Sequence, residues 1–167
     1  DTYMYHLTVP KQWLIQGRIV PTPYEMHSNL FLLTEAWNYW GLAFDREEYI
    51  LHKLWQWSAA VGTALIFVVE FRRHELKGAG WFAGVFWLLL REVGQYAPTG
   101  YVDMGGVFYA VLATALCLRS LNTQGKERLT LAILAGLCAG AATAIKISNL
   151  IYTLALIIAL AALFWQR

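Results

Sequence analysis

Hydrophobic positions in this chain fall into long apolar runs separated by short polar segments, a pattern that is typical of membrane-spanning helices. A helix needs about 20 mainly apolar residues to cross the hydrocarbon core. The run from Leu129 to Trp165 is too long for a single crossing, and we expect it to turn near Lys146. The apolar run from Gly78 to Leu90 has only 13 residues, so it either continues through Arg91 or forms a short tilted helix. The pattern therefore predicts about five spans, at residues 49–71, 78–91, 104–121, 129–145 and 150–165.

The first 48 residues are polar and aromatic, and three prolines break them. They predict two interfacial amphipathic helices, one over residues 3–17 and one from residue 28 or 29 to 40. Pro10 is expected to interrupt or bend the first helix, and Gly17 to end it. A membrane helix over residues 29–44 is a weaker alternative, because Glu35, Asn38 and Asp45 interrupt an already short run.

Composition agrees with an all-α, polytopic membrane protein. The chain is 58% hydrophobic and 14% charged, against about 25% charged residues in soluble domains. A net charge of +2, without a basic run among stacking aromatics, argues against nucleic acid as a partner. Residues 1–48 are expected to form an outer-face loop, and residues 49–167 a transmembrane helical bundle.

Basic residues gather in two of the polar joints, at 72–77 and 119–128. The positive-inside rule places these joints in the cytoplasm. Because successive spans alternate in direction, residues 1–48, the polar turn 91–103 and Lys146 then share the outer face.

Two charged residues on that face are candidates for chemistry. Asp103 directly precedes a span, where a carboxylate is favoured by the helix dipole and is expected to act as an N-cap, which does not exclude a functional role. Lys146 interrupts an apolar run, and a charge near the bilayer centre costs about 2.5 to 3.5 kcal/mol. It is therefore expected either to face a cavity or pair with an acid, or to snorkel at a helical turn.

Histidines and glycines support less specific expectations. The four histidines show no i, i+4 pairing, so a metal site built from them is poorly supported, and His52 is expected to be hydrogen-bonded near a span end. The glycines at 105–106 and 136–140 predict close packing between membrane helices.

Three segments together resemble a known enzyme family. They are Asp1-Thr-Tyr-Met-Tyr-His-Leu-Thr-Val-Pro-Lys followed by Gly17 and His27-Ser-Asn, then Tyr101-Val-Asp103, and then Ala139-Gly-Ala-Ala-Thr-Ala-Ile-Lys146. In this order, and on one membrane face, they resemble the bacterial GT-C-fold glycosyltransferases. These membrane enzymes use polyprenyl-phosphate sugars and are related to protein mannosyltransferases.

The resemblance implies transfer of a sugar from a polyprenyl-phosphate donor at the outer face of the bacterial cytoplasmic (inner) membrane. It implies that Asp1 and Asp103 are the catalytic acids and the ligands of a divalent metal, Mg or Mn, if one is used. It also implies substrate-binding roles for four residues: His6, Lys11, His27 and Lys146. Family enzymes have a membrane helix before the acidic loop and more helices later, so we expect a longer native protein.

The sequence leaves other functions open. The dense aromatics would also suit a non-catalytic transmembrane subunit of a larger respiratory or photosynthetic complex, descended from such an enzyme and held by other membrane subunits. A transporter has less support, because no paired broken helices are evident.

Overall fold

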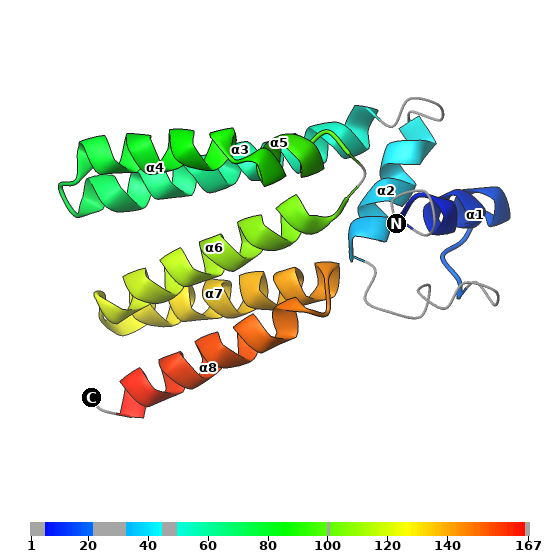
Figure 1. Ribbon diagram of the computed structural model, residues 1–167. Coiled ribbons are helices and arrows are strands. Elements are labelled where there is room, and N and C mark those ends of the chain that lie inside the picture. The colour runs from blue at the N-terminus through cyan, green and yellow to red at the C-terminus, as the bar shows by residue number, and fades with distance from the viewer. Residues whose placement is uncertain (1–5, 22–32, 45–49, 100, 166–167) are drawn as a thin grey trace.

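A computed structural model describes residues 6–21, 33–44, 50–99 and 101–165, and every regular element in these ranges is a helix. Figure 1 shows the longer helices running side by side, while α1 and α2 lie together at one end of the bundle. The elements are α1 (Thr8–Gln16), α2 (Leu33–Phe44), α3 (Ile50–Arg73), α4 (Lys77–Leu89), α5 (Arg91–Tyr96), α6 (Asp103–Leu121), α7 (Gly125–Ile145) and α8 (Asn149–Trp165).

The all-α prediction is confirmed, and three helices are long and apolar enough to cross a membrane: α3, α6 and α7. The predicted turn near Lys146 is also confirmed, because it separates α7 from α8. Helix α4 has 13 residues and ends at Leu89, so it does not continue through Arg91 as one predicted alternative had it. At about 1.5 Å per residue it spans only about 20 Å. The total of five spans therefore stays a prediction.

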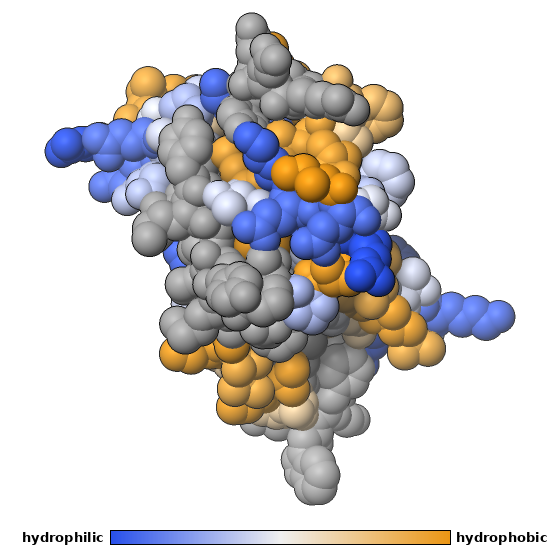
Figure 2. Space-filling model, turned by 90° about the vertical axis from the view of Figure 1, so that its right-hand side faces the viewer, coloured by the Kyte–Doolittle hydropathy of each residue, from blue (hydrophilic) through white to orange (hydrophobic). Residues whose placement is uncertain are grey.

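The bundle has two different ends. Helices α3, α6 and α8 begin, and α4 and α7 finish, at the end that carries α1 and α2, which we call the pocket end (Figure 1). Seen from this end, hydrophilic surface lies beside hydrophobic patches (Figure 2). We call the opposite end the basic end, since it carries Arg72, Arg73, Lys77, Arg119, Lys126 and Arg128.

Small residues let α4 approach α3 closely. A Cβ at Gly84 would lie 3.0 Å from the backbone oxygen of Ala64, and one at Gly80 would lie 3.1 Å from that of Val68. The indole Nε1 of Trp87 donates to the carbonyl of Ala60 at 2.9 Å. This hairpin is therefore packed backbone against backbone, as small residues permit in membrane helices.

The glycines of α6 confirm half of the packing prediction. A Cβ at Gly106 would lie 2.8 Å from the side-chain nitrogen of Asn149 and 3.7 Å from Ile145, and Gly105 packs against Ile145 and Trp55. For Gly136 and Gly140 the prediction is wrong, because among the described residues no atom lies within 4 Å of a Cβ built there.

The described part of residues 1–48 contains two helices, α1 and α2, and it corrects some of the predictions for this segment. Pro10 lies in the first turn of α1, where a missing N–H costs nothing, so it does not interrupt that helix as predicted. Gly17 ends α1 as predicted, at φ 68°, and the N–H of Arg18 reaches back to the carbonyl of Trp13 at 3.1 Å. Helix α2 runs on to Phe44, past the predicted end, and its predicted start lies outside the described residues. The predicted turn 91–103 contains the short helix α5.

Candidate active site

A pocket of about 540 Å³ at the pocket end brings together His6, Asp103 and Lys146. These residues come from the segment before α1, the first turn of α6 and the joint between α7 and α8. Aromatic and acidic side chains complete the polar part of the wall: Glu92, Tyr96 and Tyr101. The volume lies within the range of small-molecule sites, about 300 to 1,000 Å³.

Asp103 and Lys146 form an ion pair across this pocket. The Lys146 ammonium donates to Asp103 Oδ1 at 2.5 Å, and the two side chains are 49% and 28% exposed respectively. Lys146 follows the last residue of α7 with extended backbone, φ −148° and ψ 121°, and its N–H bonds to the carbonyl of Ala142. The side chain of Asn149 donates to the same carbonyl at 2.9 Å. The turn that ends α7 therefore positions the lysine.

The structure tests the sequence predictions for Lys146 and Asp103. Lys146 lies at a helical turn, lines a cavity and pairs with an acid, so the predictions of a cavity and of an acidic partner are both confirmed. The N-cap prediction for Asp103 is wrong. Val102 is the N-cap residue of α6, no side chain caps it, and Asp103 is the first helical residue.

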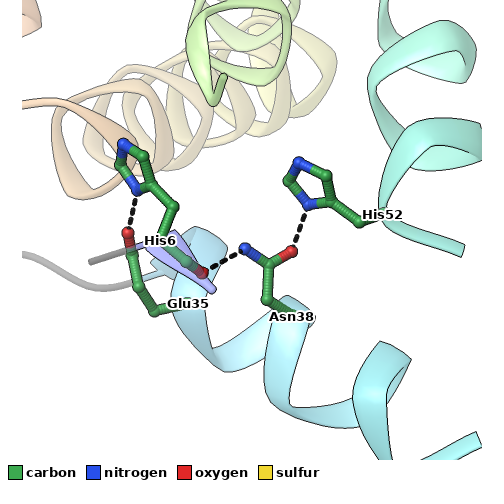
Figure 3. Close-up of polar contacts among 4 residues, drawn as sticks. All are labelled: His6, Glu35, Asn38 and His52. Carbon is green, nitrogen blue, oxygen red and sulfur yellow. Dashed lines mark hydrogen bonds and ion pairs between the residues drawn. The ribbon is translucent and has the colours of Figure 1, made fainter. Parts of the chain in front are cut away.

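A second polar group, made of His6, Glu35 and Asn38, is buried where the chain before α1 meets α2. The ring Nδ1 of His6 donates to Glu35 Oε1, and Asn38 Nδ2 donates to the backbone carbonyl of His6 at 2.8 Å (Figure 3). Glu35 and Asn38 are three residues apart on one face of the helix, so both reach the same residue. His6 is 5% exposed and Glu35 only 1%.

These contacts continue into the membrane helices. His52 Nδ1 donates to Asn38 Oδ1 (Figure 3), which confirms the expectation of a hydrogen-bonded histidine. One turn further along α3, Gln56 Oε1 accepts the N–H of Gly105 on α6 at 3.3 Å. Buried polar contacts therefore tie α2, α3 and α6 together at the pocket end, where an unpaired polar group would be costly.

The remaining predicted site residues do not reach this pocket. Asp1 and His27 lie outside the described residues. Lys11 is exposed and lines a separate hollow with Leu14, Ile15 and Leu42. Since Lys11 does not line the pocket, its predicted place beside His6 and Lys146 is not observed.

Sequence reasoning missed Glu35, Glu92, Tyr96 and Tyr101. The signal for Glu35 was present, because it and Asn38 interrupt an apolar run and a buried polar residue in such a run calls for a partner. No comparable pattern marked Glu92 or the tyrosines, which the short helix α5 and the approach to α6 bring to the wall.

The described residues do not form a metal centre. No group of three or more His, Cys, Asp or Glu side chains within them could hold an ion, and Asp103 is bound to the ammonium of Lys146. Asp1, the other predicted ligand, lies outside these residues, so the divalent metal stays a prediction.

Comparison of the chain with protein-family models, with curated proteins and with solved structures finds no match.

Proposed function

We propose that this protein is a membrane glycosyltransferase of the GT-C type, or the module of one that binds the donor. The pocket takes a sugar from a polyprenyl-phosphate donor and passes it to an acceptor at the outer membrane face. The observation that carries the proposal is the meeting of His6, Asp103 and Lys146 in one pocket at one end of an apolar bundle. The resemblance singled out these three residues from separate segments of the sequence.

The proposed donor has an apolar polyprenyl chain and a charged phosphate, and the pocket end suits both. A polyprenyl chain is apolar and stays in the bilayer, so its phosphate must be bound at the level where helices end. Lys146 supplies an ammonium at that level, half-exposed and held by Asp103. An ammonium is suited to phosphate as a compact charge with three donors. The aromatic wall formed by Tyr96 and Tyr101, whose rings meet edge to face, offers apolar surface and hydroxyls to a sugar.

In the proposed reaction the acceptor's oxygen or nitrogen forms a bond to the anomeric carbon of the sugar. The bond from that carbon to the phosphate oxygen breaks, and the polyprenyl phosphate leaves with the electron pair. Lys146 stabilises the charge on the leaving phosphate, while a basic group in the pocket takes the acceptor's proton. The resemblance assigns the basic role to a carboxylate, with Asp1 as the candidate base and Asp103 as a second acid.

The test is a transfer assay on the full chain in proteoliposomes that contain a radiolabelled polyprenyl-phosphate hexose. Lys146→Gln removes a charged contact worth about 1.5 to 3 kcal/mol, so we expect donor turnover to fall by roughly 10- to 100-fold. Lys53→Gln is the matched control, because Lys53 is exposed on α3 at the same end but does not line the pocket. Its turnover is expected to equal that of the wild type.

The proposal fails if the wild-type protein releases no polyprenyl phosphate from any labelled donor, or if both lysine variants behave alike. The competing proposal is the non-catalytic subunit of a larger membrane complex. It predicts stoichiometric co-purification with other chains and a pocket covered by them. An inactive protein that purifies only with fixed partners would establish that alternative.

A further inference from the structure

His6 lies in the wall of the pocket and is paired with Glu35, a carboxylate to which the resemblance assigns no role. We propose that His6 is the group that accepts the acceptor's proton, and that Glu35 is its positioning residue. This inference rests on the proposed function and deepens it. It names the base of the same site as an imidazole, in place of the carboxylates Asp1 and Asp103.

Two contacts from α2 hold His6 at both its ring and its backbone. Glu35 accepts the proton of ring Nδ1, and Asn38 donates to the carbonyl of the same residue at 2.8 Å. Asn38 is held in turn by His52 on α3. In Figure 3 the second ring nitrogen of His6 is turned away from Glu35 and Asn38. The imidazole is therefore fixed in position, as a proton-transfer group must be.

The contact with Glu35 also selects the chemistry of the ring. A neutral imidazole whose Nδ1–H is bound by a carboxylate has Nε2 as its basic nitrogen. This is the arrangement in which a carboxylate orients a histidine base and stabilises the imidazolium that forms. His6 also lines the pocket with Asp103 and Lys146, so this residue borders the space that a substrate would occupy.

A His6–Glu35 pair that served only to stabilise the fold would carry a large desolvation cost, because both side chains are buried. Four polar side chains of this network are 5% exposed or less, at residues 6, 35, 38 and 52. Oxygen Oε2 of Glu35 has no hydrogen-bond partner in the described part of the chain. Apolar residues of similar shape would often be at least as stable at such a site, so a buried pair beside a pocket favours a functional role.

Asp103 is a poorer candidate for the base, because its carboxylate is already bound by the Lys146 ammonium. We therefore infer that Asp103 positions the phosphate-binding lysine. The acceptor's O–H or N–H bond breaks as its heavy atom joins the sugar carbon, and the proton moves to Nε2 of His6. The imidazolium, stabilised by Glu35, then releases that proton to water.

The test measures kcat and donor KM against pH for four variants in the proteoliposome assay: His6→Gln, Glu35→Gln, Asp103→Asn and His74→Gln. A general base is worth about 100- to 10,000-fold, so His6→Gln should lower kcat by at least about 100-fold with little change in KM. Glu35→Gln should cause a smaller fall, and Asp103→Asn should mainly raise KM. His74→Gln alters an exposed histidine at the basic end and is the matched control.

The pH profile separates a base from a structural residue. If His6 is the base, wild-type kcat should fall on the acid side, and this dependence should be absent in His6→Gln. Other charged and titratable groups near His6 could also affect the pH dependence of kcat. They are Glu35 and His52 in the hydrogen-bonded network, and Glu92, Tyr96, Tyr101, Asp103 and Lys146 around the pocket. Only His6 variants should remove the acid-side fall.

Binding of farnesyl phosphate, a short soluble prenyl phosphate, checks that each variant is folded. If His6→Gln does not bind it, Glu35→Gln decides the question, since it keeps the size of the side chain and should still shift the acid-side fall. A His6→Gln protein with kcat within about threefold of wild type would overturn the role of His6 and leave the proposed function intact. A folded wild-type protein without any transfer would overturn both.

Discussion

The pocket end and the basic end both contain a carboxylate paired with a cationic or basic side chain, but the surroundings of the two pairs differ. At the pocket end, Glu35 contacts His6 with both side chains almost fully buried. At the basic end, Arg119 donates through Nε to Glu70 Oε1 at 2.7 Å, and the side chains are 29% and 18% exposed respectively. The residue types are similar, but solvent reaches only one of the pairs.

The two ends differ in whether their charged and polar side chains are exposed to solvent or buried around a cavity. Basic side chains such as Arg72, Arg73 and Lys126 are exposed at the joints, where cations suit lipid headgroups. At the pocket end, polar groups come from distant parts of the chain and lie against one another around a cavity. Surface charge can orient a protein in the membrane, whereas buried polar groups that are hydrogen-bonded to one another can form a binding or catalytic site.

The largest expected effect concerns sidedness, and it is all-or-none. In a background in which alanine replaces Cys117 and Cys138, a cysteine at exposed Ile15 should react with a membrane-impermeant maleimide only from the outside of intact cells. A cysteine at exposed Gln124, between α6 and α7, should react only after the membrane is opened. Labelling of both positions from one side would mean that the two ends do not face opposite compartments.

Removal of the buried carboxylate should have the next largest effect. Glu35→Ala leaves the polar groups around His6 without their partner, which typically costs about 3 to 5 kcal/mol of unfolding free energy. The measurement is the unfolding equilibrium of the purified protein in detergent micelles. A loss below about 1 kcal/mol would mean that the network at the pocket end adds little to stability.

Close packing at Gly106 should make substitution there more costly than at Gly136. Gly106→Val places new atoms against Asn149 and Ile145, and overpacking of this kind costs about 1 to 3 kcal/mol. Gly136→Val is the matched control, because it makes the same change in a helix where nothing described lies within 4 Å of the new Cβ. Equal destabilisation of the two variants in the same unfolding assay would contradict the close approach of α6 to the α7–α8 turn.

The smallest expected effect lies at the basic end. Glu70→Ala breaks the pair with Arg119, and because both side chains are partly solvated, we expect a loss of about 1 kcal/mol or less. The loss should shrink in high salt, since exposed pairs are screened. If Glu70→Ala were as costly as Glu35→Ala, burial would not be what separates the two ends.

Much of the architecture follows from local sequence patterns. The apolar runs predicted the positions of α3, α6 and α7 to within a few residues, and the long final run predicted the turn at Lys146. Gly17 marked the end of α1, because few other residues adopt positive φ easily. These features depend on hydrophobic length and local backbone preference, which the order of residues determines by itself.

The pocket depended on tertiary structure. Asp103 and Lys146 are 43 positions apart, and His6 and Glu35 are 29 apart, and no periodicity links such positions. Sequence could mark each one as a polar residue in costly surroundings, but which partner it meets is decided by how the helices pack. The same packing placed Lys11 at a separate hollow and brought Glu92 and two tyrosines to the wall. Hydrophobic runs determine which segments become helices, whereas contacts between helices determine which side chains share a cavity.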